Sequence, residues 1–149
     1  MIIRPMELRD VEAVAEIEKI CFTTPWSENA YRDTLSNENA LYLVAETKDT
    51  KMIVGMCGVL KILDEGDISN VAVHPDYRRK SIAKQMMEEL LSRGQKFGID
   101  AFTLEVRAGN EAAVKLYEYF GFKTEGLRKR FYDKPVEDAL IMWKRKEDR

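Results

Sequence analysis

Two side chains that can move protons fall on neighbouring predicted elements in the second half of the sequence. Glu105 belongs to the alternating segment 101–106, in which Phe102 and Leu104 share one face and Glu105 points to the other. Tyr117 belongs to the helical segment that follows the next turn. A carboxylate and a phenol that meet at a strand end could accept and donate the protons that move when an amine attacks a thioester. Neither residue identifies a site alone, because a strand glutamate is usually on the surface and a helix tyrosine usually in the core.

Three consecutive cations precede a predicted helix. Arg78, Arg79 and Lys80 come directly before the helix 82–97, at the end where the helix macrodipole is positive and acidic residues are normally favoured. A bound anion would account for them, because the free N–H groups of a first helical turn bind phosphate or pyrophosphate. The simpler interpretation is a solvated basic turn beside an ordinary core helix.

The elements that must position these residues follow a mixed α/β pattern. Apolar runs and alternation predict strands at 2–3, 40–47, 52–63, 68–73, 101–106, 122–127 and 136–143. Helical spacing and caps predict helices at 9–22, after Ser27, at 82–97 and at 111–120. The last two strands would be antiparallel and joined across 128–135. We therefore expect an α/β (α+β) fold with a mixed, twisted sheet of about six to seven strands and about four helices.

Composition narrows the function classes. The chain has 149 residues, 45% of them hydrophobic, which predicts one domain over residues 1–149. Lys and Arg number 24 against 26 Asp and Glu, and this balance argues against a nucleic-acid-binding surface. No segment approaches the ~18 to 20 apolar residues of a membrane span, and the start lacks a signal-peptide pattern. Cys21 and Cys57 have no metal-ligand spacing, which predicts free thiols in a reducing cytoplasm and no metal.

Several segments resemble motifs of the GNAT N-acetyltransferases. Residues 78–83 (RRKSIA) resemble the turn with which that family binds the pyrophosphate of acetyl-CoA, although Ser81 stands where the family usually has glycine. Residues 103–110 (TLEVRAGN), with LY at 116–117 and GF at 121–122, closely resemble the RimI-type ribosomal-protein-alanine N-acetyltransferases, one branch of the family. Further matches, PWS at 25–27 and EDALIM at 137–142, extend the resemblance over almost the entire chain.

The resemblance implies a role for each matched residue. Glu105 would be the general base and Tyr117 the general acid. The residues implied to bind acetyl-CoA are Val71, Ala72 and Val73 along the pantetheine arm, Arg78, Arg79, Lys80, Ser81, Ile82, Ala83 and Lys84 around the pyrophosphate, and Asn110. The residues implied to receive the acceptor are Trp26, Phe131, Tyr132 and Asp138. Trp26 lies between the first two predicted helices, and a tryptophan in such a position is more often a core residue. The strands 68–73 and 101–106 would splay apart to open the acetyl-binding slot.

The function implied is transfer of acetyl from acetyl-CoA to a protein N-terminus, favouring the N-terminal alanine of a small-subunit ribosomal protein. The reaction would proceed by direct attack in a ternary complex, in a monomer or weak dimer without metal, membrane or nucleic acid. Two alternatives stay open: a GNAT enzyme for a small amine or a lysine side chain, and a catalytically weak acetyl-CoA-binding or partner-binding module. Ser81 bears on the second, because it adds a side chain where the chain passes closest to phosphate, although its hydroxyl can also donate to an anion.

Overall fold

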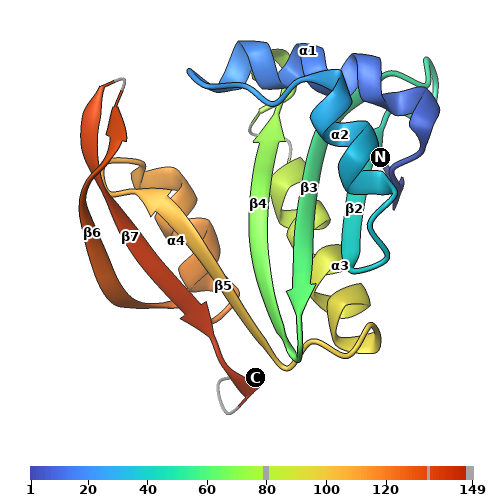
Figure 1. The fold of residues 1–149 in the computed structure, drawn as a ribbon. Helices are drawn as coiled ribbons and strands as arrows, with labels where there is room; N and C mark the ends of the chain where they lie inside the picture. Colours follow the sequence, from blue (N-terminus) through green and yellow to red (C-terminus); the bar gives the residue numbers. More distant parts are fainter. Residues whose placement is uncertain (79–80, 134, 147–149) are drawn as a thin grey trace.

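The structure is a computed structural model that describes residues 1–78, 81–133 and 135–146. Its strands form one seven-stranded sheet in the order β1-β2-β3-β4-β5-β7-β6 (Figure 1). The strands are β1 (Ile2–Pro5), β2 (Ala40–Glu46), β3 (Ile53–Ile62), β4 (Glu65–Val73), β5 (Ala101–Arg107), β6 (Lys123–Asp133) and β7 (Val136–Lys144). The α-helices are α1 (Val11–Cys21), α2 (Glu28–Leu35), α3 (Ile82–Lys96) and α4 (Glu111–Tyr119), and short 3₁₀ turns occupy η1 (Leu8–Asp10) and η2 (Pro75–Tyr77). The predicted α/β fold with a mixed sheet is confirmed.

The two central strands part from each other along their length. β4 and β5 run parallel, but they pair only at the start of each strand, where Glu65–Asp67 lie opposite Ala101–Thr103. Beyond that point β4 pairs with β3 and β5 pairs with β7, both antiparallel. Figure 1 shows the resulting V-shaped separation between the upper parts of β4 and β5. The predicted splay is therefore present, and it exposes backbone edges in the middle of the sheet.

Helices cover both faces of the sheet. α3 and α4 lie on one face, where Met86, Met87 and Leu90 are fully buried with Phe102 of β5. α1 and α2 lie on the other, where Tyr31 and the sheet residue Tyr42 belong to a second apolar cluster. Each large apolar side chain buried in this way stabilises the fold by about 1.5–3 kcal/mol. The sheet is thus held from both sides around the opening between β4 and β5.

The connection predicted at 128–135 is wrong: most of it is strand. β6 continues to Asp133 and pairs with β7, with an irregular register between Arg128 and Tyr132. Arg130 has a positive φ of 53°, which marks this irregularity. The run of exposed cations in this part of β6 carries no alternation of apolar and polar residues, so the strand was not visible in the sequence. Backbone pairing with β7 decides the conformation instead.

None of the helices in the described residues is long and apolar enough to cross a membrane.

Candidate active site

Two adjoining cavities open where β4 and β5 part. The first, of about 640 Å³, extends between the α1–α2 connection and the β6–β7 hairpin, and we name it the hairpin-side cavity. The second, of about 660 Å³, extends between the starts of α3 and α4, and we name it the helix-side cavity. Of the residues that the structure describes, six line both cavities: Cys21, Phe22, Val71, Asn110, Ala113 and Tyr117. Two ligands that enter from opposite faces of the sheet can therefore meet between the central strands.

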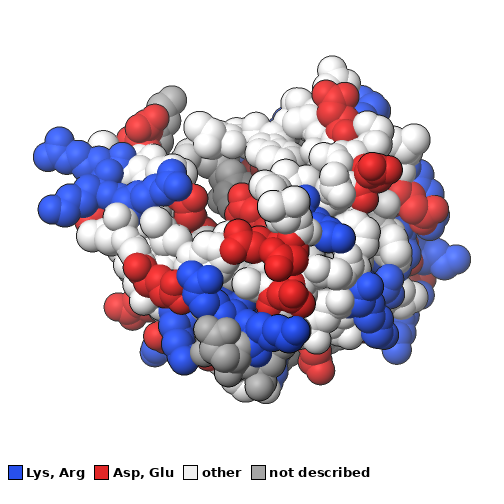
Figure 2. Space-filling model, turned by 60° about the horizontal axis from the view of Figure 1, so that its bottom comes forward, with Lys and Arg blue, Asp and Glu red and all other residues white. Residues whose placement is uncertain are grey.

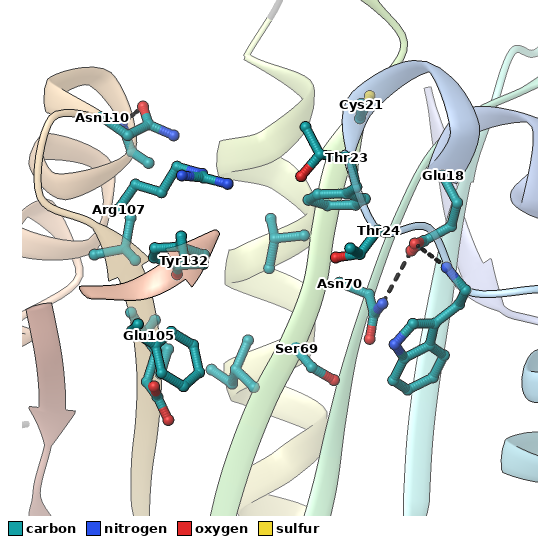
Figure 3. Close-up of a pocket in the computed structure, with 18 of the residues that line it drawn as sticks. Glu18, Cys21, Thr23, Thr24, Ser69, Asn70, Glu105, Arg107, Asn110 and Tyr132 are labelled. Carbon is teal, nitrogen blue, oxygen red and sulfur yellow. Dashed lines mark hydrogen bonds between the residues drawn. The ribbon is translucent and has the colours of Figure 1, made fainter. Parts of the chain in front are cut away.

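Glu105 lines the hairpin-side cavity, as its place in β5 predicts. Its neighbours Leu104 and Val106 are buried, so alternation along the strand turns the Glu105 side chain to the other face. Figure 3 shows Glu105 on the strand that forms one wall of the cavity, across from Ser69 on the other. Its Oε2 lies 3.6 Å from Nε of Arg128, and the Glu105 side chain is 30% exposed.

Tyr117 lies at the junction of the two cavities. It is buried in α4, and its ring meets Phe122 edge-on with 6.0 Å between centroids. α4 begins with Asn110, whose Oδ1 accepts a hydrogen bond of 3.2 Å from the amide of Ala113. Burial raises the pKa of the Tyr117 phenol well above its usual value. The phenol therefore stays protonated at neutral pH and can act as a proton donor.

The helix-side cavity contains every predicted coenzyme-binding residue that the structure describes. These are Val71, Ala72, Val73, Arg78, Ser81, Ile82, Ala83, Lys84 and Asn110. Arg79 and Lys80 lie outside the described residues. Since the β4–β5 ladder ends at Asp67, the later edge of β4 has no β5 neighbour among the described strands. An extended ligand could add to this edge as a further strand does.

The turn into α3 has an unusual backbone. Ser81 has φ 60° and ψ 20°, the left-handed conformation, and its side chain forms no cap hydrogen bond to α3. Glycine adopts this conformation without the steric cost that a Cβ brings, which is a physical reason for glycine at such a turn. Arg78 is directed elsewhere: its Nε donates to the carbonyl of Val73 at 3.2 Å and its Nη2 to Sγ of Cys21 at 3.5 Å.

The predicted acceptor residues do not all lie at the cavity. Trp26, Phe131 and Tyr132 line the hairpin-side cavity. Asp138 is not among the described residues that line it. Its Oδ1 accepts a 2.9 Å hydrogen bond from the amide of Arg130, across the irregular part of the β6–β7 pairing. The geometry therefore gives Asp138 a place in the hairpin rather than at the cavity wall.

Sequence reasoning missed a carboxylate in the wall of the hairpin-side cavity. Glu18 is 1% exposed and accepts hydrogen bonds from Tyr31 Oη at 2.5 Å, Asn70 Nδ2 at 2.9 Å and the amide of Trp26 at 2.9 Å. Figure 3 shows the last two of these bonds. The signal available in the sequence was a glutamate among the apolar positions of a helix. These bonds hold α1, the α1–α2 connection and β4 together at the cavity.

Two more residues of the hairpin-side cavity carried no sequence prediction. Asn70 has a positive φ of 56° at a bulge in β4, where Asn70 and Val71 lie opposite the single residue Cys57 of β3. Arg107 stands at the end of β5, and its guanidinium carbon lies 4.1 Å from the ring centroid of Tyr132. The sequence offers no signal for either residue, because a positive φ at a residue other than glycine and a ring contact between strands both depend on tertiary structure.

The charges around the hairpin-side cavity are of both signs. In the described part of the chain, three carboxylates line it, those of Glu18, Asp67 and Glu105. Burial raises the pKa of Asp67, and the charge of Arg128 opposes that rise. Figure 2 shows cationic side chains gathered on the projecting left edge, on the side of β6 and β7, and acidic side chains nearer the middle beside a hollow. A cationic amine entering the cavity would therefore meet acidic groups on its wall.

The described residues contain no cluster of metal-binding side chains. No group of three or more His, Cys, Asp or Glu side chains is arranged to hold a metal ion in that part of the chain. Both cysteines are free, Cys57 buried and Cys21 partly buried. Burial raises the pKa of each thiol, and at Cys21 the Arg78 guanidinium opposes the rise. The arrangement instead offers a carboxylate, a protonated phenol and a helix N-terminus around two joined cavities.

Comparison with known proteins gives one consistent result. Residues 11–122 match the model of the acetyltransferase (GNAT) family. A Bacillus subtilis (strain 168) protein, provisionally named as a [ribosomal protein bS18]-alanine N-acetyltransferase, is 38% identical over 142 residues, covering 95% of this chain and 93% of its own. The Escherichia coli (strain K12) [ribosomal protein bS18]-alanine N-acetyltransferase is 34% identical over 142 residues, covering 94% of both chains. A crystal structure of the E. coli enzyme superposes with a TM-score of 0.85 at 33% identity, over 95% of this chain and 91% of that one.

Proposed function

This chain belongs to the acetyltransferase (GNAT) family, and we propose that it transfers acetyl from acetyl-CoA to the α-amine of a protein N-terminus. We propose as its preferred acceptor the N-terminal alanine of a small-subunit ribosomal protein. The names of the relatives from B. subtilis and E. coli, which align over nearly the whole chain, support this acceptor. The free thiols of Cys21 and Cys57 favour a reducing compartment, and we propose the cytoplasm.

The observation that carries the proposal is the meeting of two cavities at Tyr117. The helix-side cavity combines an open edge of β4 with the N-terminus of α3, which suits a long ligand ending in phosphates. The hairpin-side cavity carries Glu105 and is open toward the other face. An acyl donor and an amine can thus approach each other without sharing an entrance, as direct transfer in a ternary complex requires.

The chain's own groups account for the proton transfers. Acetyl-CoA, when bound, supplies an activated thioester. Glu105, directly or through water, would take a proton from the acceptor ammonium, whose pKa of about 8 makes this a modest task. The freed amine nitrogen would then attack the thioester carbonyl, forming the C–N bond and breaking the C–S bond, and the nitrogen would lose its second proton to water. Tyr117, kept protonated by burial, would donate its proton to the departing sulfur.

A matched pair of peptides tests the acceptor. Both begin with alanine and contain one internal lysine, and one of them carries a formyl group on its N-terminus. With acetyl-CoA and the protein, we expect acetylation of the free peptide at its α-amine, and no acetylation of the blocked peptide, by mass spectrometry. Equal acetylation of both peptides at lysine would overturn the α-amine proposal and would favour a lysine acetyltransferase.

A further inference from the structure

Arg107 occupies a position that links three segments around the hairpin-side cavity. It follows Glu105 by two residues on β5, so the two side chains share the face that borders the cavity. Figure 3 shows Arg107 reaching from this strand toward Tyr132. The guanidinium carbon lies 4.1 Å from the centroid of the Tyr132 ring, within the range of a favourable cation–π contact.

The same guanidinium contacts the second strand of the hairpin. Nη1 of Arg107 donates to the carbonyl of Pro135 at 3.1 Å and lies 3.4 Å from Oε1 of Glu137. Tyr132 and Glu137 are register partners across β6 and β7. One planar cation therefore fixes the ring of Tyr132 and the backbone at the hairpin's end in a single arrangement.

Glu137 extends this arrangement to the loop that begins α4. Its second oxygen, Oε2, accepts a hydrogen bond of 2.6 Å from the amide of Gly109. A Cβ at position 109 would lie 2.7 Å from that oxygen, so a residue other than glycine would push the carboxylate away. The next residue, Asn110, caps α4 and lines both cavities. The contacts thus run from the hairpin to the helix that carries Tyr117.

We infer that Arg107 is a positioning residue of the acceptor cavity. Through the Tyr132 ring and the Glu137 carboxylate it holds the β6–β7 hairpin against the loop 108–110, and so sets where the acceptor amine lies relative to Glu105. This inference rests on the proposed function, because it assigns the hairpin-side cavity to the acceptor. The side chains of Arg107 and Glu137 are each 27% exposed, so the ion pair by itself adds little stability. The contribution of the pair is to fix the position of the β6–β7 hairpin relative to the loop 108–110.

Substitution Arg107→Lys tests the inference, because lysine keeps the charge and loses the planar fork. We expect KM for the acceptor to rise about ten-fold, with KM for acetyl-CoA within about two-fold of wild type. Tyr132→Leu should produce a similar rise. The double variant should be little worse than either single one, because both remove the same contact. Tyr132→Phe keeps the ring and should keep most of the affinity.

A matched control exists at the other end of the same hairpin. The guanidinium of Arg145 lies 4.2 Å from the Trp143 ring and pairs with Glu125 at 2.7 Å, away from both cavities. Arg145→Lys should therefore leave both KM values unchanged. An equal rise in acceptor KM in Arg145→Lys and Arg107→Lys would mean that the hairpin is merely destabilised, and would overturn the inference.

Hydrogen exchange provides a readout that needs no acceptor. In Arg107→Lys, and in Glu137→Gln should the first variant fold poorly, the Gly109 amide should exchange faster while core amides of β3 stay protected. Unchanged exchange at Gly109 would overturn the inference even if no acceptor were known. The two proposals fail separately: acetylation of lysine alone refutes the α-amine acceptor, whereas an unchanged KM in Arg107→Lys for whichever amine is used refutes the positioning role.

Discussion

Arg128 of β6 and Glu105 of β5 form an ion pair across the intervening strand β7, with 3.6 Å between Nε and Oε2. The carboxylate that we propose as the general base thus faces a cation on β6. The Arg128 side chain is 56% exposed and also lies 5.4 Å from the Phe131 ring centroid. A pair this exposed is worth about 1 kcal/mol or less, so an entering amine can replace the arginine at small cost.

Arg128→Gln should therefore strengthen acceptor binding. At neutral pH an α-amine with a pKa of about 8 is mostly an ammonium ion, which competes with Arg128 for Glu105. We expect the acceptor KM to fall about two- to five-fold, and the difference from wild type to shrink as salt is added. Steady-state kinetics at two ionic strengths measures both effects. Arg130→Gln, on the same strand, is the control for loss of one charge, and a higher KM in Arg128→Gln would mean that Arg128 itself contacts the acceptor.

The raised pKa of Tyr117 predicts a particular pH profile. A phenol whose pKa is raised by burial keeps its proton below that raised value, so the proton donor is not lost in the ordinary range of tyrosine ionisation near pH ~10. Wild-type kcat should rise between about pH 7 and about pH 9, because the acceptor ammonium, with a pKa of about 8, loses its proton in this range. It should show no decline up to about pH 10, because Tyr117 keeps its proton. Tyr117→Phe should reduce kcat about ten- to hundred-fold across this range. A decline near pH ~10 in wild type that is absent in Tyr117→Phe would contradict the raised pKa, whereas undiminished kcat in Tyr117→Phe would contradict the role of proton donor.

Ser81 gives a prediction about stability and coenzyme binding together. Its positive φ costs a residue with a Cβ about 1–2 kcal/mol, part of which Ser81→Gly recovers despite the greater freedom of glycine in the unfolded chain. Ser81→Gly should melt about 2–4 °C higher than Ser81→Ala, which still carries the strain. It should also bind CoA more tightly, because the turn can approach a phosphate more closely. Thermal unfolding and calorimetry measure both, and weaker CoA binding in both variants would show that the hydroxyl donates to the ligand.

Local sequence patterns were sufficient to predict an element, and the face on which a side chain lies, where apolar residues recur at a regular spacing. Alternation of Phe102, Leu104 and Val106 placed Glu105 on the open face of β5, and Asn110 marked the start of α4. The resemblance to the GNAT family added the splay of β4 and β5, which neither strand encodes alone. These predictions depend on residues close in the chain or on a motif shared with other proteins.

Features that depend on distant partners were not accessible in this way. Glu18 is satisfied by Tyr31 and Asn70, which lie 13 and 52 residues away in the chain. The second half of β6 carries exposed charges without alternation, so only pairing with β7 makes it a strand. Asp138 matched a motif, but its carboxylate binds the backbone of Arg130. In each case the deciding contact joins elements whose proximity only the fold determines.

The most direct test of the central claim is the turnover of Glu105→Gln, measured together with its dissociation constant for CoA. Glutamine keeps the size of the side chain and removes its ability to take a proton. We expect kcat to fall about a hundred-fold or more, while the CoA dissociation constant stays within about two-fold of wild type. Glu125→Gln, another strand glutamate paired with an arginine, should keep full activity. Undiminished turnover in Glu105→Gln would contradict the account, because the carboxylate between the two strands would then have no part in the reaction.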